Sequence, residues 1–207
     1  MSKSPAKVLL LFAHPSLDRS EVNASLLRAS RKVESVTVVD LYGEYPDYRI
    51  DIEREQQRLR DHDALVFMFP LYWYSTPAIL KEWQDLVLEY GFAYGEDGDA
   101  LHGKLFMCAI TAGGSESAYR AEGYNHFTLR ELLTPLEQTA NLIGMQFLPP
   151  YALFGARTAL EEGRAERHVA DWVRVLTALR DGVLDTDRAR SLRKLKDDLP
   201  AVLGGAL

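Results

Sequence analysis

The stretch Asp63-Ala-Leu-Val-Phe-Met-Phe-Pro-Leu-Tyr-Trp-Tyr-Ser-Thr-Pro-Ala78 decides the fold of this 207-residue chain. Its apolar run, residues 64–69, has no polar alternation, which is typical of a short strand buried on both faces of a sheet. Pro70 ends the strand, and Pro77 suits the first turn of a following helix. Between the two prolines lies a loop of large side chains, Leu71 to Tyr74. A loop at the carboxyl end of a parallel strand is where open α/β sheets bind ligands.

The same alternation of apolar runs and helical patterns covers most of the chain. Further strands are predicted at residues 7–13, 36–40, 104–111 and 145–154, and helices at 22–33, 52–61, 77–90, 127–144 and 159–179. Pro149-Pro150 interrupts the last strand and places part of it at an edge, and Pro135 kinks or breaks its helix. Such alternation predicts a parallel sheet with helices on both faces. Five strands and right-handed crossovers favour the three-layer flavodoxin-like α/β fold, order 2-1-3-4-5.

Composition and charge indicate one soluble domain spanning residues 1–207, with a core at about 7–180. The charged tail, 181–207, is expected to be helical around 189–199, with basic residues 188–196 on a solvated helix face. The net charge of −6 and the lack of a basic patch argue against nucleic-acid binding. Because the chain lacks a long apolar span and a signal peptide, we expect a cytoplasmic protein. The single cysteine, Cys108, is expected to be an inert core thiol.

The loops after the strands at 7–13, 64–69 and 104–111 are predicted to meet at one edge of the sheet. In the first, Ser20 is a plausible N-cap, and the helix N-terminus behind it could bind a phosphate. The loop has no glycine-rich fingerprint, so neither a Walker loop nor a dinucleotide Rossmann turn is indicated. An ordinary capped helix after a strand explains the same pattern.

A flat, conjugated ligand would complete this set of loops. Gly113 and Gly114 permit positive φ and close approach of the backbone to a ligand. An anion site, an aromatic wall and a glycine floor together suit flavin mononucleotide, whose ring edge could reach the N–H groups near Trp73 and Tyr74. The aromatic side chains would equally suit a dimer interface, and His14 could be an ordinary hydrogen-bonded loop residue. No metal-binding or Ser-His-Asp pattern is evident.

Several motifs resemble the NAD(P)H:quinone oxidoreductase family of flavodoxin-like flavoproteins. They are Phe12-Ala-His-Pro15, Pro70-Leu-Tyr-Trp-Tyr74 and Thr111-Ala-Gly-Gly114, and the resemblance covers residues 7 to 180. Tyr45-Pro-Asp47 and the segment 101–104 narrow it towards the ancillary subunits of glutathione-regulated Kef potassium efflux systems. The resemblance implies a ping-pong reaction, in which NAD(P)H gives a hydride to flavin and a quinone then takes it. The alternative function is a regulatory subunit that binds and activates a Kef-type membrane protein, which would place it at the inner membrane.

The resemblance also implies the residues that bind the cofactor, FMN or alternatively FAD. All of them lie in the three loops: His14, Ser20, Glu21, Val22, Asn23, Leu71, Tyr72, Trp73, Tyr74, Thr111, Ala112, Gly113 and Gly114. NAD(P)H is the implied co-substrate. Family members form homodimers with the active site near the interface, which would account for the aromatic loop.

Three more residues are implied to act in catalysis. Family members often carry a Tyr and a His beyond the glycine pair, which relay charge when the flavin is reduced. Tyr119 matches the Tyr, whereas the His position falls on Asn125 and His126 follows it. Asn125 can donate a hydrogen bond but cannot carry a proton, while His126 can titrate near neutral pH. Packing of Tyr119 against a partner subunit, with a solvated His126, would explain the same residues without catalysis.

Overall fold

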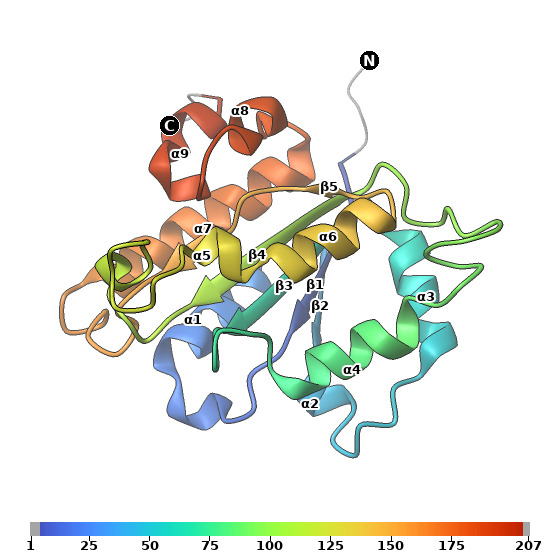
Figure 1. The fold of residues 1–207 in the computed structure, drawn as a ribbon, viewed down its shortest axis with the longest axis horizontal. Helices are drawn as coiled ribbons and strands as arrows, with labels where there is room; N and C mark the ends of the chain where they lie inside the picture. Colours follow the sequence, from blue (N-terminus) through green and yellow to red (C-terminus); the bar gives the residue numbers. More distant parts are fainter. Residues whose placement is uncertain (1–4, 205–207) are drawn as a thin grey trace.

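The computed structural model describes residues 5–204, which form a parallel sheet between two layers of helices (Figure 1). The strands in this range are β1 (Val8–Phe12), β2 (Val36–Asp40), β3 (Ala64–Pro70), β4 (Leu105–Thr111), β5 (Gln146–Phe147) and β6 (Tyr151–Leu153). Their order is β2-β1-β3-β4-β5, with β6 also paired to β4, so the predicted order 2-1-3-4-5 is confirmed. The predicted fifth strand is instead two strands. Pro149 and Pro150 have no N–H for the ladder, and they separate the pieces.

Alternate side chains of the strands fill two hydrophobic cores, one on each face of the sheet. Along β1, Leu9 and Leu11 belong to one core, and Val8, Leu10 and Phe12 to the other. The first core lies under α3 (Ile52–Asp61), α4 (Ala78–Val87), α5 (Leu129–Leu132) and α6 (Thr134–Leu142), and the second under α1 (Glu21–Ser30) and α7 (Arg164–Asp181). The predicted helices on both faces are therefore confirmed.

Cys108 lies in the first core and is fully buried, and burial raises the pKa of its thiol. The prediction of a core thiol is confirmed, since a protonated and inaccessible thiol is unreactive.

Several element boundaries differ from the sequence-based prediction. The helix expected at 127–144 is broken at Leu133, and Pro135 occupies the first turn of α6, where its missing N–H costs nothing. The helix expected at 159–179 begins only at Arg164. The helix expected at 77–90 ends at Val87, and Leu88 is its C-cap. Where a connection was expected, Leu41–Glu44 forms the short helix α2.

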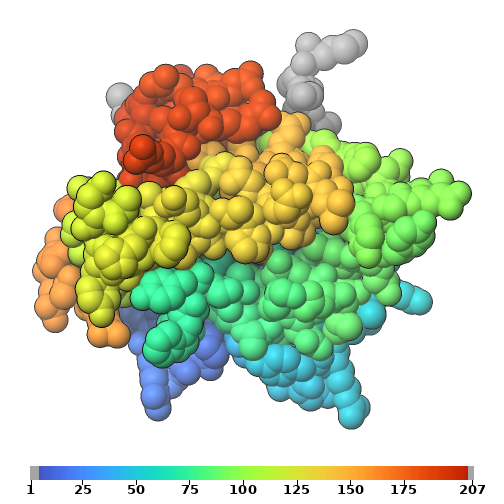
Figure 2. Space-filling view, viewed as in Figure 1, coloured from blue at the N-terminus to red at the C-terminus, as the bar shows by residue number. Residues whose placement is uncertain are grey.

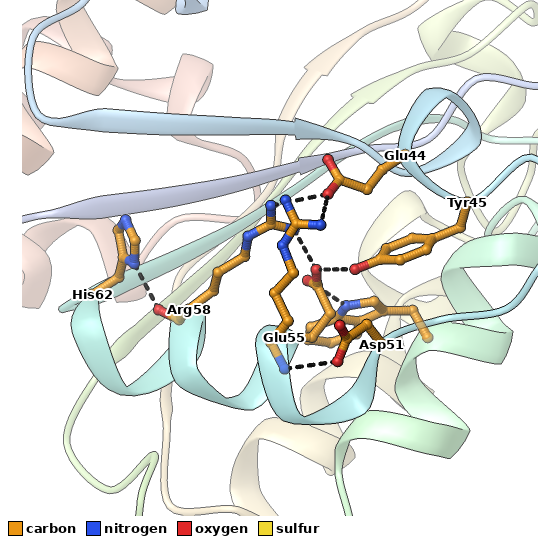
Figure 3. Close-up of polar contacts among 8 residues, drawn as sticks. Glu44, Tyr45, Asp51, Glu55, Arg58 and His62 are labelled. Carbon is orange, nitrogen blue, oxygen red and sulfur yellow. Dashed lines mark hydrogen bonds and ion pairs between the residues drawn. The ribbon is translucent and has the colours of Figure 1, made fainter.

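The helix α3 contains a fully buried carboxylate, that of Glu55 (Figure 3). The hydroxyl of Tyr45 donates to it at 2.6 Å and the indole N–H of Trp83 at 3.0 Å. The guanidinium of Arg58 pairs with the same carboxylate and reaches Glu44 at 3.2 Å. A buried charge is tolerated only when it is paired and hydrogen-bonded. This network joins α2, α3 and α4 across the outer side of the first core.

The C-terminal segment, defined here as residues 184–203, folds onto the second core, in red in Figure 1. It contains α8 (Thr186–Arg190), a 3-10 turn at Leu195–Asp197 and α9 (Leu199–Val202), so the single helix expected around 189–199 is wrong. Its apolar side chains are buried: Leu184, Ala189, Leu195, Leu199, Val202 and Leu203. Burial of these side chains offsets the conformational entropy that the segment loses on folding. The expectation that residues 188–196 form one solvated helix face is therefore wrong. Within residues 5–204, no helix is long and apolar enough to span a bilayer.

Candidate functional site

A cleft of about 1120 Å³ opens at the carboxyl ends of β1, β3 and β4. Its lining includes every residue that the sequence implied for cofactor binding: His14, Ser20, Glu21, Val22, Asn23, Leu71, Tyr72, Trp73, Tyr74, Thr111, Ala112, Gly113 and Gly114. Figure 2 shows the turquoise loop after β3 between the blue region of α1 and the yellow segment that follows β4. The structure thus brings the three predicted loops together in one cleft.

The first loop presents the N-terminus of α1 to this cleft. The hydroxyl of Ser20 caps the helix, accepting from the backbone N–H of Asn23 at 3.4 Å and from its side-chain amide at 2.8 Å. The N–H groups of the first turn have no partners inside the helix, so they suit an anion such as a phosphate. The buried amide of Asn23 also donates to Thr111 Oγ1 at 3.0 Å. Asn23 therefore fastens the first loop to the end of β4.

His14 lies buried at the base of the cleft. The backbone N–H of Ser16 donates to its Nδ1 at 3.1 Å, which requires that nitrogen to be unprotonated. The ring stacks on Phe12 and meets the edge of Tyr72, with centroids 6.4 and 6.0 Å apart. Burial lowers the pKa of His14, while the charge of Asp18 opposes the shift. A neutral imidazole at this place holds the first loop against the aromatic wall.

The loop after β3 makes a tight turn that carries backbone strain. The N–H of Ser75 donates to the carbonyl of Tyr72 at 3.0 Å, and the two residues between them, Trp73 and Tyr74, have φ of 49° and 63°. A left-handed backbone conformation costs about 1–2 kcal/mol of free energy for each residue that has a Cβ. The Trp73 side chain is 93% exposed, so burial in the chain's own core does not offset this cost. Strain of this kind clusters at binding sites.

Gly113 and Gly114 form the floor of the cleft by leaving space. Neither has a positive φ, so the backbone does not use the left-handed conformation that a glycine permits. A Cβ on Gly114 would lie 3.3 Å from the Tyr119 ring, and one on Gly113 would lie 3.6 Å from Arg157 Nε. The absence of a side chain, and not an unusual backbone angle, is what these glycines supply.

Of the three residues implied in catalysis, only Tyr119 lines the cleft. Its ring packs on Phe154 at 5.2 Å, and burial, followed by the nearby Tyr74, raises its pKa. Asn125 lies at the rim, where its side-chain oxygen accepts a hydrogen bond from the Tyr74 hydroxyl at 3.2 Å. His126 is exposed and does not line the cleft. It ends a turn in which its N–H donates to the carbonyl of Gly123, and its own φ is 60°.

The cleft also has a fourth wall that the sequence analysis missed. Ala156, Arg157 and Leu160 follow β6, and the exposed Arg157 lies beside Gly113. The rule that ligands bind at the carboxyl edge of a parallel sheet, applied also to the last strand, would have pointed to this loop. Additional lining residues from the predicted loops are Ser16, Asp18, Arg19 and Pro70. Within residues 5–204, no cluster of His, Cys, Asp and Glu is arranged to hold a metal.

Known proteins match this chain over most of its length. A model of the flavodoxin-like fold family matches residues 6–176. The ancillary protein KefG of a glutathione-regulated potassium-efflux system, from Cronobacter sakazakii, is 49% identical over 83% of this chain and 96% of its own. A structure of general stress protein 14 from Treponema denticola in complex with FMN is 37% identical, with a TM-score of 0.79 over 84% of this chain and 99% of that one.

A third similar protein is described as an enzyme. The structure of an NADPH-quinone reductase from P. pentosaceus is 31% identical, with a TM-score of 0.74 over 82% of this chain and 96% of that one. The family model covers more than half of the chain, and these relatives are matched over nearly their whole length. The chain therefore belongs to the flavodoxin-like oxidoreductase family that contains quinone reductases and the ancillary proteins of potassium efflux systems.

Proposed function

We propose that this protein is an FMN-dependent NAD(P)H:quinone oxidoreductase. The observation that carries the proposal is the convergence of thirteen residues, from three separate loops, on one cleft at the carboxyl edge of the sheet. Ligand pockets usually have volumes of about 300–1,000 Å³. A cleft of about 1120 Å³ therefore has room for a flavin and for part of a second ring system beside it.

The residues present fit a flavin mononucleotide. Ser20 and the first turn of α1 would hold the phosphate, since they combine a hydroxyl with the backbone N–H groups of a helix N-terminus. The strained turn at Trp73 and Tyr74 would direct main-chain groups at the polar edge of the ring, and Gly114 leaves the floor open. The Treponema denticola relative was solved with FMN, which supports FMN over the alternative, FAD.

Bound FMN would supply two-electron hydride chemistry, taking a hydride from NAD(P)H and passing it to a quinone in a ping-pong cycle. Tyr119, whose pKa burial raises above its ordinary value, keeps its proton at neutral pH and can donate a hydrogen bond into the cleft. A donor there stabilises negative charge that develops next to it. The aromatic wall of Tyr72 and Trp73 would stack with NAD(P)H and then with the quinone.

Exposed aromatic residues in the segments that follow β3 and β4 support a homodimer. Trp73 is 93% exposed, Tyr124 86% and Phe127 55%, although aromatic residues of this size favour buried or interfacial positions. A specific interface of this kind should bury more than about 1,000 Å² in total. Light scattering at micromolar protein tests the proposal. A mass of 23.4 kDa, that of one chain, would contradict it.

The cofactor and the activity can be tested on purified protein. We expect a flavin absorbance spectrum, release of FMN on denaturation, and oxidation of NADH or NADPH that depends on an added quinone. Apoprotein incubated with FMN or FAD should otherwise regain the chromophore and show a thermal shift. If neither flavin binds, the proposal fails. If only FAD binds, the cofactor assignment is wrong while the reaction class stands.

A second candidate function rests on the 49% identity to KefG. In this role the protein would be cytoplasmic and would bind a Kef-type potassium efflux protein at the inner membrane, which it would activate. Co-purification with the transporter encoded nearest to its gene would support that role. Efflux that persists with a Tyr119→Phe variant deficient in turnover would show regulation without catalysis, whereas the absence of any association would exclude this candidate.

A further inference from the structure

The C-terminal segment lies beyond the part of the chain that matches the family. The family model ends at residue 176, and KefG is matched over 96% of its own length by 83% of this chain. The segment nevertheless has a fixed place. Leu195 is fully buried in the second core, and its N–H donates to the carbonyl of Pro150, just before β6, at 3.1 Å. This chain thus carries a folded element that the family model does not cover.

One side chain, Lys194, connects this segment to the loop after β4. Its ammonium lies 2.6 Å from the carboxylate of Glu116 and 2.7 Å from that of Asp197. Burial lowers the pKa of Lys194, but hydrogen bonds with Asp197 and Glu116 outweigh it, and the pKa is raised overall. The ammonium is therefore charged at neutral pH. Figure 2 shows the red C-terminal segment beside the yellow segment that follows β4.

Glu116 lies between the two parts of its loop that line the cleft. Gly114 precedes it, and its carbonyl accepts a hydrogen bond from the N–H of Gly155 at 2.8 Å. Tyr119 follows it and packs on Phe154. Residues 115–117 are exposed between these two anchors. Among the ion pairs of residues 5–204, the one formed by Glu116 is with Lys194, so this pair ties down the middle of the loop.

We infer that Lys194 is a positioning residue for the cleft: through Glu116, the C-terminal segment holds the loop that carries Gly114 and Tyr119. The consequence for flavin binding rests on the function proposed above, whereas the tether is a property of the protein alone. A second cavity of about 860 Å³ borders the pair and admits water. Because partly exposed ion pairs are weak, the effect on FMN affinity is about two- to fivefold.

The affinity test compares three variants by quenching of FMN fluorescence on binding. Lys194→Ala should raise the Kd for FMN by about two- to fivefold, and Lys194→Arg, which keeps the charge, should restore most of the affinity. Arg188→Ala is the matched control, because it removes an ion pair with Asp198 inside the same segment. Its Kd should equal that of the wild type. Glu116→Gln should weaken binding as Lys194→Ala does, and the double variant should lose no more than either single one.

Hydrogen exchange of the flavin-free protein tests the tether independently of any cofactor. The amides of residues 115–119 should exchange faster in Lys194→Ala than in the wild type. Their exchange rates in Arg188→Ala should equal those of the wild type. Equal exchange in Lys194→Ala and the wild type would overturn the inference, as would additive effects of Lys194→Ala and Glu116→Gln on FMN affinity. A wild-type protein that binds no flavin would refute the proposed function instead, and the exchange result would still decide the tether.

Discussion

Replacing Glu55 by glutamine should destabilise the protein more than any other replacement of an acidic residue of α3 by its amide. Glutamine has the shape of glutamate but only one acceptor oxygen. In the native network, Tyr45 and Arg58 donate to one oxygen of Glu55, and Trp83 donates to the other (Figure 3). If the glutamine oxygen serves Tyr45, its NH₂ group faces the indole N–H, and two donors oppose each other in a dry interior.

The magnitude follows from the partners that are lost. An unsatisfied buried donor costs about 1–3 kcal/mol. Removing one member of a buried ion pair costs about 3–5 kcal/mol, although Arg58 is 18% exposed and keeps Glu44 as a second partner. We therefore expect Glu55→Gln to lose about 3–4 kcal/mol of unfolding free energy. For a chain of this length the Tm should fall by roughly 10 °C.

Urea unfolding followed by circular dichroism measures this loss, and Glu53→Gln is the control. Glu53 is exposed on the same helix, so its change should stay within about 0.5 kcal/mol. The network residues do not line the cleft, so the FMN affinity of the folded variant should not change. A loss below about 1 kcal/mol in Glu55→Gln would refute the view that the carboxylate is charged and satisfied in the core.

Other predictions concern the cleft and the pH dependence of stability. Ser20→Glu places a carboxylate at the expected phosphate site, and calorimetry should show FMN affinity at least tenfold weaker; unchanged affinity would remove the phosphate from that loop. Tyr119→Phe should slow flavin reduction by NAD(P)H in stopped-flow experiments, by about tenfold or more if the hydroxyl assists proton transfer. A rate equal to that of the wild type would assign the ring to packing. Burial, helped by Lys196, lowers the pKa of His168 to about 3 from an ordinary 6.5. The unfolded state therefore binds the proton better, so stability that is full above pH 6.5 falls as the pH drops towards 3, by about 2 kcal/mol at pH 5. Urea titrations of His168→Gln should show a shallower pH slope; the same slope would mean that other groups cause it.

Short-range patterns in the sequence predicted the scaffold of the site correctly. The apolar runs around Leu10, Val66 and Cys108 are unbroken over strand length, and only a sheet buried on both faces accommodates them. Alternation with helices then implied the strand order, and the strand order placed the three loops at one edge. Ser20 acted through a hydroxyl that caps the helix directly after it, and Pro135 through its missing backbone N–H. Such features depend on chain neighbours, which a sequence displays directly.

The features that depend on partners distant in the sequence could not be predicted in the same way. Glu55 looks like any residue of a polar helix until Trp83, 28 positions away, donates to it in the core. Likewise, the charge of Lys194 suggested a solvated tail. In the structure, the neighbouring Leu195 is buried in the core, and Lys194 pairs with Glu116, 78 positions away. The sequence by itself therefore determined the sheet and the loops that form the cleft. Tertiary structure alone decided which charges are buried and which loops they hold, because the desolvation of a charge is offset only by partners that the folded chain brings together.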